Sequence, residues 1–260
     1  MKQPIGIFDA GIGSYAIVER VQQRFPQQDI VYLADRASFP YGDKSAEALL
    51  TSVTKATRYL QQQGCGAVIL ASNAPSVMVL EQLCTLVEIP VVGIFPPVLE
   101  ALRISRSGRM AVLGVKSMVA SEAMQRYVAH YADDVLLVNA SSMVDLVENF
   151  TFLKDVARTR ECVARFVHEL LAAHPDVDVM TLSSTHLPWL RPFFETAAPH
   201  ITFLDPADSV LEQIEPHTTA GTGAIRCIAS ETSALPLSEF NAALAQLGVE
   251  WRAAVCTIVE

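Results

Sequence analysis

The sequence predicts an α/β protein of two similar domains, each with a mainly parallel sheet, and an active-site cleft between them. Two observations support this prediction. Short apolar runs alternate with helical patterns along the chain, which is typical of parallel sheets covered by helices on both faces. Two of these runs also end alike, one at Ser72-Asn73 and the other, about a hundred residues later, at Ser184-Thr185-His186.

Composition narrows the class of protein. The 260 residues are 51% hydrophobic and 18% charged, which excludes a disordered chain and allows one large or two medium domains. The net charge of −9 lacks the basic footprint of a nucleic-acid binder. The N-terminus does not resemble a signal peptide, and no apolar run has the length of a membrane helix. We therefore expect a cytoplasmic protein with no membrane and no nucleic-acid partner.

The elements follow from the period of the apolar residues. Strands are predicted at 5–9, 30–35, 67–72, 90–95, 110–115, 135–140, 177–184 and 201–206. Helices with 3.6-residue spacing are predicted at 14–25, 45–64, 74–83, 118–131 and 159–174. Pro26 and Gly64 are suitable helix stops, and 217–226 is expected to be a flexible glycine-bearing loop.

Each half therefore contributes one equivalent strand end. The run "IGIFDAGIG" has a counterpart in "AVLGVKSMVAS", just as Ser72 has one in Ser184. Open α/β sheets bind ligands beyond the carboxyl ends of their strands. Two such halves that face each other would each supply one serine-bearing loop to a shared cleft.

Cofactor and metal motifs have simpler explanations. Gly11-x-Gly13-x-x-Ala16 partly matches a dinucleotide fingerprint, with Asp35 ending the next strand. Asp9, however, would place a carboxylate beside the pyrophosphate, which favours a tight glycine turn instead. The five cysteines are scattered and form no CxxC pair, so we expect reduced thiols, no metal and no cofactor.

Five segments occur in an order and spacing typical of one family: "GIFDAGIGS", "ADRASFPYGDKS", "LASNAPS", "LSSTHLP" and "LDPADSV". Through them the chain resembles, end to end, the cofactor-independent glutamate racemases of the aspartate/glutamate racemase superfamily. The resemblance implies domains at 1–95 plus 206–260 and at 96–205, and a homodimer. It also implies a small amino or dicarboxylic acid as ligand, and a role in making D-glutamate as a peptidoglycan precursor for cell wall biogenesis.

The resemblance also implies a two-thiol mechanism, in which one thiolate removes the α-proton and an opposing thiol returns another. The family's two cysteines correspond to Ser72 and Ser184 in this sequence. A serine hydroxyl is much less acidic than a thiol, whose pKa is about 8.5 and can be lowered by neighbours. Asp9 and His186 match the family's acid and histidine beside the thiols. The predicted catalytic set is therefore altered at its two central positions.

The substrate-binding set is altered as well. Ala10, Ala74 and Met118 stand where the resemblance implies hydroxyl side chains, so the predicted pocket is more apolar and the loss of donors disfavours tight glutamate binding. By the same resemblance, the pocket includes Ala10, Pro40, Tyr41, Gly42, Asn73, Ala74, Met118, Glu148 and Thr185. Structural roles are the alternatives: a turn cap for Asp9, loop hydrogen bonds for Asn73 and Thr185, and packing for His186.

Three functions stay open on the sequence. The first is a racemase-like pseudoenzyme that binds a small amino or carboxylic acid, with racemisation of L- and D-glutamate lost or strongly impaired. The second is an active enzyme, either an amino-acid racemase or one with changed, one-sided chemistry on a carboxylic acid, through Ser184 and His186. The third is a non-catalytic regulatory protein that acts through a protein partner.

Overall fold

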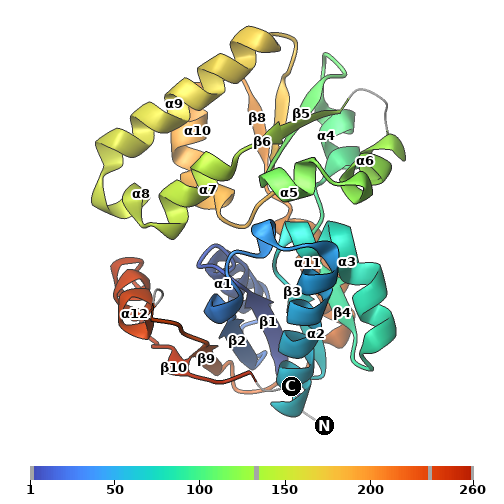
Figure 1. Ribbon diagram of the computed structural model, residues 1–260, viewed down its shortest axis with the longest axis vertical. Helices are drawn as coiled ribbons and strands as arrows, with labels where there is room; N and C mark the ends of the chain where they lie inside the picture. The colour runs from blue at the N-terminus through green and yellow to red at the C-terminus, as the bar shows by residue number, and fades with distance from the viewer. Residues whose placement is uncertain (1–2, 132–134, 234–235, 259–260) are drawn as a thin grey trace. The chain divides into compact units, whose positions relative to one another are not determined.

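A computed structural model describes residues 3–131, 135–233 and 236–258, and its ribbon is drawn in Figure 1. The chain divides into two compact units, Met1–Ile94 with Ala207–Glu260 and Phe95–Pro206. Both are α/β units, and each described strand runs parallel to the strands it pairs with. The predicted fold class is confirmed on this point.

The first unit is built on a six-stranded sheet in the order β10-β9-β2-β1-β3-β4. Its strands are β1 (Ile5–Asp9), β2 (Ile30–Ala34), β3 (Ala67–Leu70), β4 (Val91–Gly93), β9 (Ile225–Ala229) and β10 (Ala254–Val255). Its helices are α1 (Tyr15–Arg24), α2 (Ala46–Gln62), α3 (Asn73–Leu86), α11 (Ala207–Ile214) and α12 (Leu237–Gln246), with short 3-10 turns η1 (Arg36–Ser38), η2 (Tyr41–Asp43) and η4 (Glu215–His217).

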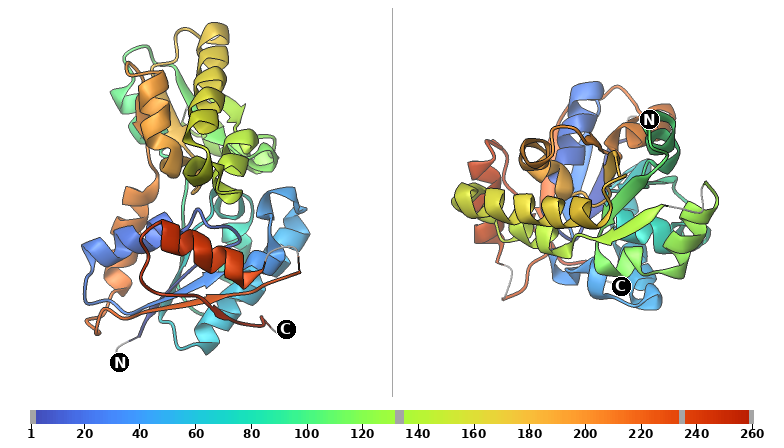
Figure 2. Two further views of the ribbon diagram at one scale, coloured as in Figure 1. Left: turned by 90° about the vertical axis from the view of Figure 1, so that its left-hand side faces the viewer. Right: turned by 90° about the horizontal axis from the view of Figure 1, so that it is seen from above.

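Helices cover both faces of this sheet. Helix α2 packs against α3 on one face, and α1 packs against α11 on the other, as the view from above in Figure 2 shows. The buried side of α2 carries Leu49, Val53 and Leu60 at helical spacing. These side chains join Phe8 of β1 and Val68 of β3 in one hydrophobic core. The apolar periodicity of the sequence therefore marks the helix face that the sheet buries.

The second unit has a four-stranded sheet in the order β6-β5-β7-β8. Its strands are β5 (Met110–Gly114), β6 (Leu136–Asn139), β7 (Val179–Leu182) and β8 (Thr202–Leu204). Its helices are α4 (Val98–Ile104), α5 (Lys116–Val119), α6 (Glu122–Ala129), α7 (Ser141–Glu148), α8 (Thr151–Lys154), α9 (Val156–Ala173) and α10 (Arg191–Ala197), with the 3-10 turn η3 (Leu187–Leu190). Helix α9 packs against α10. These two helices lie on one side of the sheet and α4 on the other (Figure 1).

Two predicted elements differ from the structure. The helix predicted at 118–131 is two helices, because Ser121 accepts a hydrogen bond from the backbone N–H of Met124 and so caps a new helix, α6. The loop predicted at 217–226 gives way to strand β9 at Ile225, which pairs with Ile30 of β2. None of the helices in the described ranges combines the length and apolar character of a membrane span.

The segment before β9 is held by Asp29, the residue that precedes β2. Oδ1 of Asp29 accepts hydrogen bonds from the backbone N–H and the hydroxyl of Thr222, both at 2.8 Å, and from the N–H of Ala224 at 3.0 Å. These donors, the Thr222 N–H first among them, lower the pKa of Asp29. Gly223 lies between the two donor residues at a φ of 74°. The chain is thus held in register for β9 to pair with β2.

We predict that Gly223→Ala destabilises the protein more than Gly64→Ala. Both glycines have positive φ, so alanine costs about 1–2 kcal/mol of backbone strain at either position. A Cβ at Gly223 would also lie 2.3 Å from the carbonyl oxygen of Pro26, whereas nothing lies within 4 Å of one at Gly64. Urea unfolding should give a free energy of unfolding lower by at least about 1 kcal/mol for Gly223→Ala than for Gly64→Ala. Equal values would contradict the close packing against Pro26.

We also predict that Asp29 makes stability depend on acid pH. A carboxyl whose pKa is lower in the folded state stabilises the fold above its unfolded-state pKa of about 3.9, and this contribution is lost as pH falls through the folded-state pKa. Asp29→Asn should therefore be less stable than wild type near neutral pH. Its free energy of unfolding should also fall less than that of wild type below about pH 4. The exposed Asp145→Asn in α7 serves as control, and parallel curves for Asp29→Asn and wild type would refute the prediction.

Candidate functional site

In the first unit, the predicted site residues lie at the carboxyl edge of the sheet. Strand β1 ends at Asp9, whose side chain is 3% exposed and whose Oδ1 accepts the N–H of Ala10 at 2.7 Å. This contact is the turn cap expected if Asp9 has a structural role. Ala10 is buried beside it. Asp9 also contributes to raising the pKa of Tyr41, after burial and the charge of Asp35. Asp9 and Tyr41 are therefore near neighbours at this edge.

The loop after β3 carries the first of the two serines. Ser72 is half-buried and directly precedes α3, while Asn73 and Ala74 are buried in its first turn. Nδ2 of Asn73 donates to the carbonyl of Ile94 at 3.3 Å, which is the kind of loop hydrogen bond expected if Asn73 has a structural role. Its Oδ1 is buried and has no hydrogen-bond partner among the described residues. That oxygen is an acceptor that a ligand or a water molecule can satisfy.

The Pro40-Tyr41-Gly42 loop is held by a buried carboxylate. The hydroxyl of Tyr41 donates to Oδ2 of Asp35 at 2.9 Å, and that of Ser230 donates to Oδ1 at 3.1 Å. Burial raises the pKa of Asp35, although these hydroxyls oppose the rise. In the sequence, Asp35 is recognisable only as the end of a strand, and no motif singles out Ser230. Asp35 follows β2 and Ser230 follows β9, so these two side chains meet only because the two strands pair in the sheet.

The second unit places its predicted residues at the equivalent edge. Ser184 follows β7 by two positions, as Ser72 follows β3, and Ser184, Thr185 and His186 are all buried. Nε2 of His186 lies 2.9 Å from Oε2 of Glu148, the last residue of α7. Both side chains are less than a tenth exposed. The structure thus brings together two predicted residues 38 positions apart as a buried imidazole–carboxylate pair.

Met118, in helix α5 of the same unit, packs over the end of β5. Its side chain is fully buried, and its Cε lies 2.2 Å from where a Cβ on Gly114 would be placed. The methionine therefore packs directly over the end of β5, where a hydroxyl side chain would offer a donor. The neighbouring Ser117 has a buried Oγ without a hydrogen-bond partner in the described part of the chain. This corner of the unit therefore combines an apolar side chain with a buried hydroxyl.

None of the five cysteines takes the place of Ser72 or Ser184, although Cys256 directly follows β10. Cys65 and Cys227 are buried, Cys84 is exposed, and Cys162 and Cys256 are half-buried. Burial raises the pKa of Cys65 to about 12 and also raises that of Cys227. These thiols stay protonated at neutral pH. No group of three or more metal-ligating side chains occurs among the described residues.

These edges supply hydrogen-bond donors and acceptors rather than a strong nucleophile. The first unit offers the Asp9 carboxylate and the Asn73 amide, and the second offers the hydroxyl of Thr185 and the imidazole of His186. Such groups suit the carboxylate and ammonium groups of a small amino acid. Abstraction of a proton from carbon needs, in addition, a base that is well matched in pKa to the operating pH.

Comparisons with known proteins agree with this architecture. The Asp/Glu/Hydantoin racemase family model matches residues 15–214. A glutamate racemase from Herpetosiphon aurantiacus is 32% identical over 216 residues, which is 82% of this chain and 84% of the relative. The structure of Escherichia coli glutamate racemase in complex with L-glutamate and the activator UDP-MurNAc-Ala aligns with a TM-score of 0.86 at 21% identity, over 99% of this chain and 100% of that one.

A second solved structure gives the same result. Glutamate racemase isoform RacE1 from Bacillus anthracis aligns with a TM-score of 0.80 at 22% identity, over 100% of this chain and 98% of that one. The predicted resemblance is therefore confirmed by a family model over most of the chain and by a relative above 30% identity. The chain belongs to the Asp/Glu/Hydantoin racemase family and is a member of its glutamate racemase branch.

Proposed function

We propose that this protein binds a small amino or dicarboxylic acid and has lost the two-thiol racemisation of glutamate. The observation that carries the proposal is the matched placement of Ser72 and Ser184, each two positions after a buried parallel strand. In a family whose members invert a carbon centre from two faces, these are the positions of the two acid–base groups. Here both groups are hydroxyls.

Stereo-inversion at carbon requires one group that removes a proton and another that returns one on the opposite face. A thiol can do both near neutral pH, since its pKa of about 8.5 is within reach of modest electrostatic tuning. A serine hydroxyl needs a partner base to become reactive. The carboxylate of Asp9 already accepts the N–H of Ala10, and His186 is already paired with Glu148. Each of these groups thus has a structural role that needs no catalysis.

The ligand class rests on the groups that remain. Asp9 offers a carboxylate for an ammonium group, and Asn73 offers a buried acceptor. The E. coli relative was solved with L-glutamate, and one from Francisella tularensis with D-glutamate. In this chain, Ala10, Ala74 and Met118 are apolar, and each lost hydrogen bond to a buried ligand group costs about 1–3 kcal/mol. We therefore propose a ligand with fewer polar groups around its α-carbon than glutamate has, or glutamate bound weakly.

A second candidate function is one-sided chemistry on a carboxylic acid, such as decarboxylation or hydrolysis. The Glu148–His186 pair favours it, because a carboxylate that orients a histidine is a common arrangement for moving protons. Ser184 precedes that histidine by two positions. Turnover of a carboxylic acid that Ser184→Ala abolishes would favour this enzyme over the binding protein.

We predict that the purified protein does not exchange the α-proton of glutamate with solvent. Incubation of L-glutamate or D-glutamate in D₂O, followed by proton NMR, should show no loss of the α-proton signal beyond that in buffer alone. The Herpetosiphon glutamate racemase provides a positive control under identical conditions. Exchange of either enantiomer at a rate near that of the control would mean that hydroxyl side chains can perform this step, and the proposal would be abandoned.

We predict that Ser72→Cys combined with Ser184→Cys restores measurable interconversion of L- and D-glutamate, whereas neither single variant does. Two thiols are needed because each serves only one face of the α-carbon. Adding Ala74→Thr should raise the rate further by up to about tenfold, since it returns one hydrogen bond with a net worth of about 0.5–1.5 kcal/mol. Chiral chromatography measures the outcome. An inactive double variant that Ala74→Thr does not improve would place the loss elsewhere than in the acid–base pair.

A further inference from the structure

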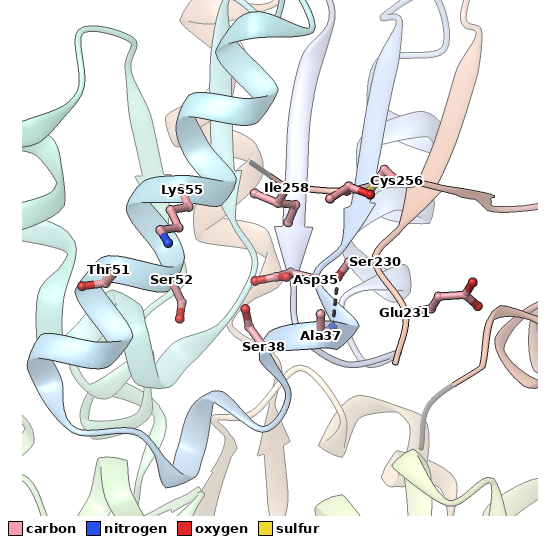
Figure 3. Close-up of a pocket in the computed structure, with 11 residues that line it drawn as sticks. Asp35, Ala37, Ser38, Thr51, Ser52, Lys55, Ser230, Glu231, Cys256 and Ile258 are labelled. Carbon is pink, nitrogen blue, oxygen red and sulfur yellow. Dashed lines mark hydrogen bonds between the residues drawn. The ribbon is translucent and has the colours of Figure 1, made fainter. Parts of the chain in front are cut away.

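The first unit contains a polar pocket next to the Pro40-Tyr41-Gly42 loop. Its volume is about 340 Å³, which lies within the range of small-molecule sites. Residues at the carboxyl ends of β2, β9 and β10 line it together with α2, among them Asp35, Ser38, Ser52, Lys55, Ser230 and Cys256 (Figure 3). The carboxyl edge of a parallel sheet is the usual ligand-binding edge of α/β folds. The pocket is distinct from the residues around Asp9 and Ser72, because neither of them lines it.

Opposite charges line this pocket. Besides Asp35 and Lys55, the lining includes Glu231, an exposed carboxylate whose Oε2 already accepts the N–H of Leu237 at 2.9 Å. Asp35, only 2% exposed, forms part of one side with Ser38. Lys55 and Ser52, three residues apart on α2, form the other. In Figure 3 the oxygens of Asp35 and Ser38 face α2 across the space that separates the two pairs. The hydroxyl of Ser52 donates to the carbonyl of Ala48 at 3.0 Å, so the lone pairs of its oxygen face outward as acceptors.

This arrangement selects an uncharged ligand. An anion attracted to Lys55 would lie close to the carboxyl of Asp35, and a cation attracted to Asp35 would lie close to Lys55. A hydroxyl group satisfies both sides, because it can accept a hydrogen bond from an ammonium and donate one to a carboxylate or to Ser52. Ile258 adds an apolar surface against which the C–H face of a sugar can pack. We propose that this pocket binds a small polyhydroxyl compound, a sugar or a polyol.

The pocket is connected to the proposed substrate loop by Asp35. One oxygen of this carboxyl accepts the Tyr41 hydroxyl at 2.9 Å, and the other accepts the Ser230 hydroxyl at 3.1 Å. Ser230 in turn accepts the N–H of Ala37 at 3.0 Å. A ligand hydroxyl that donates to Asp35 shares this carboxylate with the Tyr41 hydroxyl, so the two hydrogen bonds are not independent. Occupation of the pocket therefore changes how firmly Tyr41 is held, a consequence that rests on the proposed function of the Tyr41 loop.

The test is a titration of the full-length, isotope-labelled protein with D-ribose and with D-glucose, followed by NMR. We expect saturable shifts of the backbone amides of Ser52, Lys55 and Ser230. Lys55→Met keeps most of the side-chain length but removes the ammonium, and should weaken binding about tenfold or more. Ser52→Ala should weaken it less and serves as a second variant should Lys55→Met misfold. Lys154→Met, on α8 of the other unit, removes the same charge outside the pocket and should bind as wild type does.

Three results would overturn the proposal: no saturable shift with either sugar, saturable shifts with inorganic phosphate but with neither sugar, or equal sugar affinity in wild type and both pocket variants. The coupling is tested by titrating glutamate with and without saturating sugar. A change in glutamate affinity supports it, and an unchanged affinity rejects it. If glutamate does not bind at all, glutamate is excluded as the ligand of the proposed function, while the sugar titration still decides whether the pocket is a binding site.

Discussion

The parallel order of both sheets is the constraint on which the rest of this protein depends. Because every strand in a parallel sheet ends at the same edge, the residues that follow the strands gather there without further design. In the first unit this edge collects Asp9, Asp35 and Ser72, and in the second it collects Ser184 and His186. The chemistry of the protein is therefore decided by a few loop residues, while the buried strands serve only to hold them.

The two serines are accompanied by apolar residues at other predicted site positions. Met118 fills the end of β5, and Ala10 and Ala74 are both buried where they offer no donor. At the same time, Glu148 and His186 still form a buried hydrogen-bonded pair. A buried pair of this kind is costly to break from one side only, since the remaining group keeps its desolvation penalty. The cost of breaking it is thus a sufficient physical reason for the pair to be kept, whatever chemistry the site performs.

Much of the fold could be predicted from sequence. The strands β1, β2 and β5 are continuous apolar runs, and the buried face of α2 repeats at helical spacing. Strand β9 could not be recognised, because Arg226 interrupts its apolar residues and a glycine-bearing loop precedes it. Strand β10 has two exposed residues and no pattern at all. Strand β9 forms on the edge that β2 offers, and β10 forms on the edge that β9 then offers, so both depend on the assembled sheet.

The candidate site was predictable as a set of positions but not as a set of contacts. Motifs identify Tyr41 and His186, but their partners Asp35 and Glu148 are chosen by the fold. The central claim concerns what the two hydroxyls cannot do, and the amount of D-glutamate formed tests it most directly. Prolonged incubation of the unmodified protein with saturating L-glutamate, followed by separation of the enantiomers, should give no D-glutamate above the blank. Steady formation of D-glutamate in proportion to protein concentration would contradict the account.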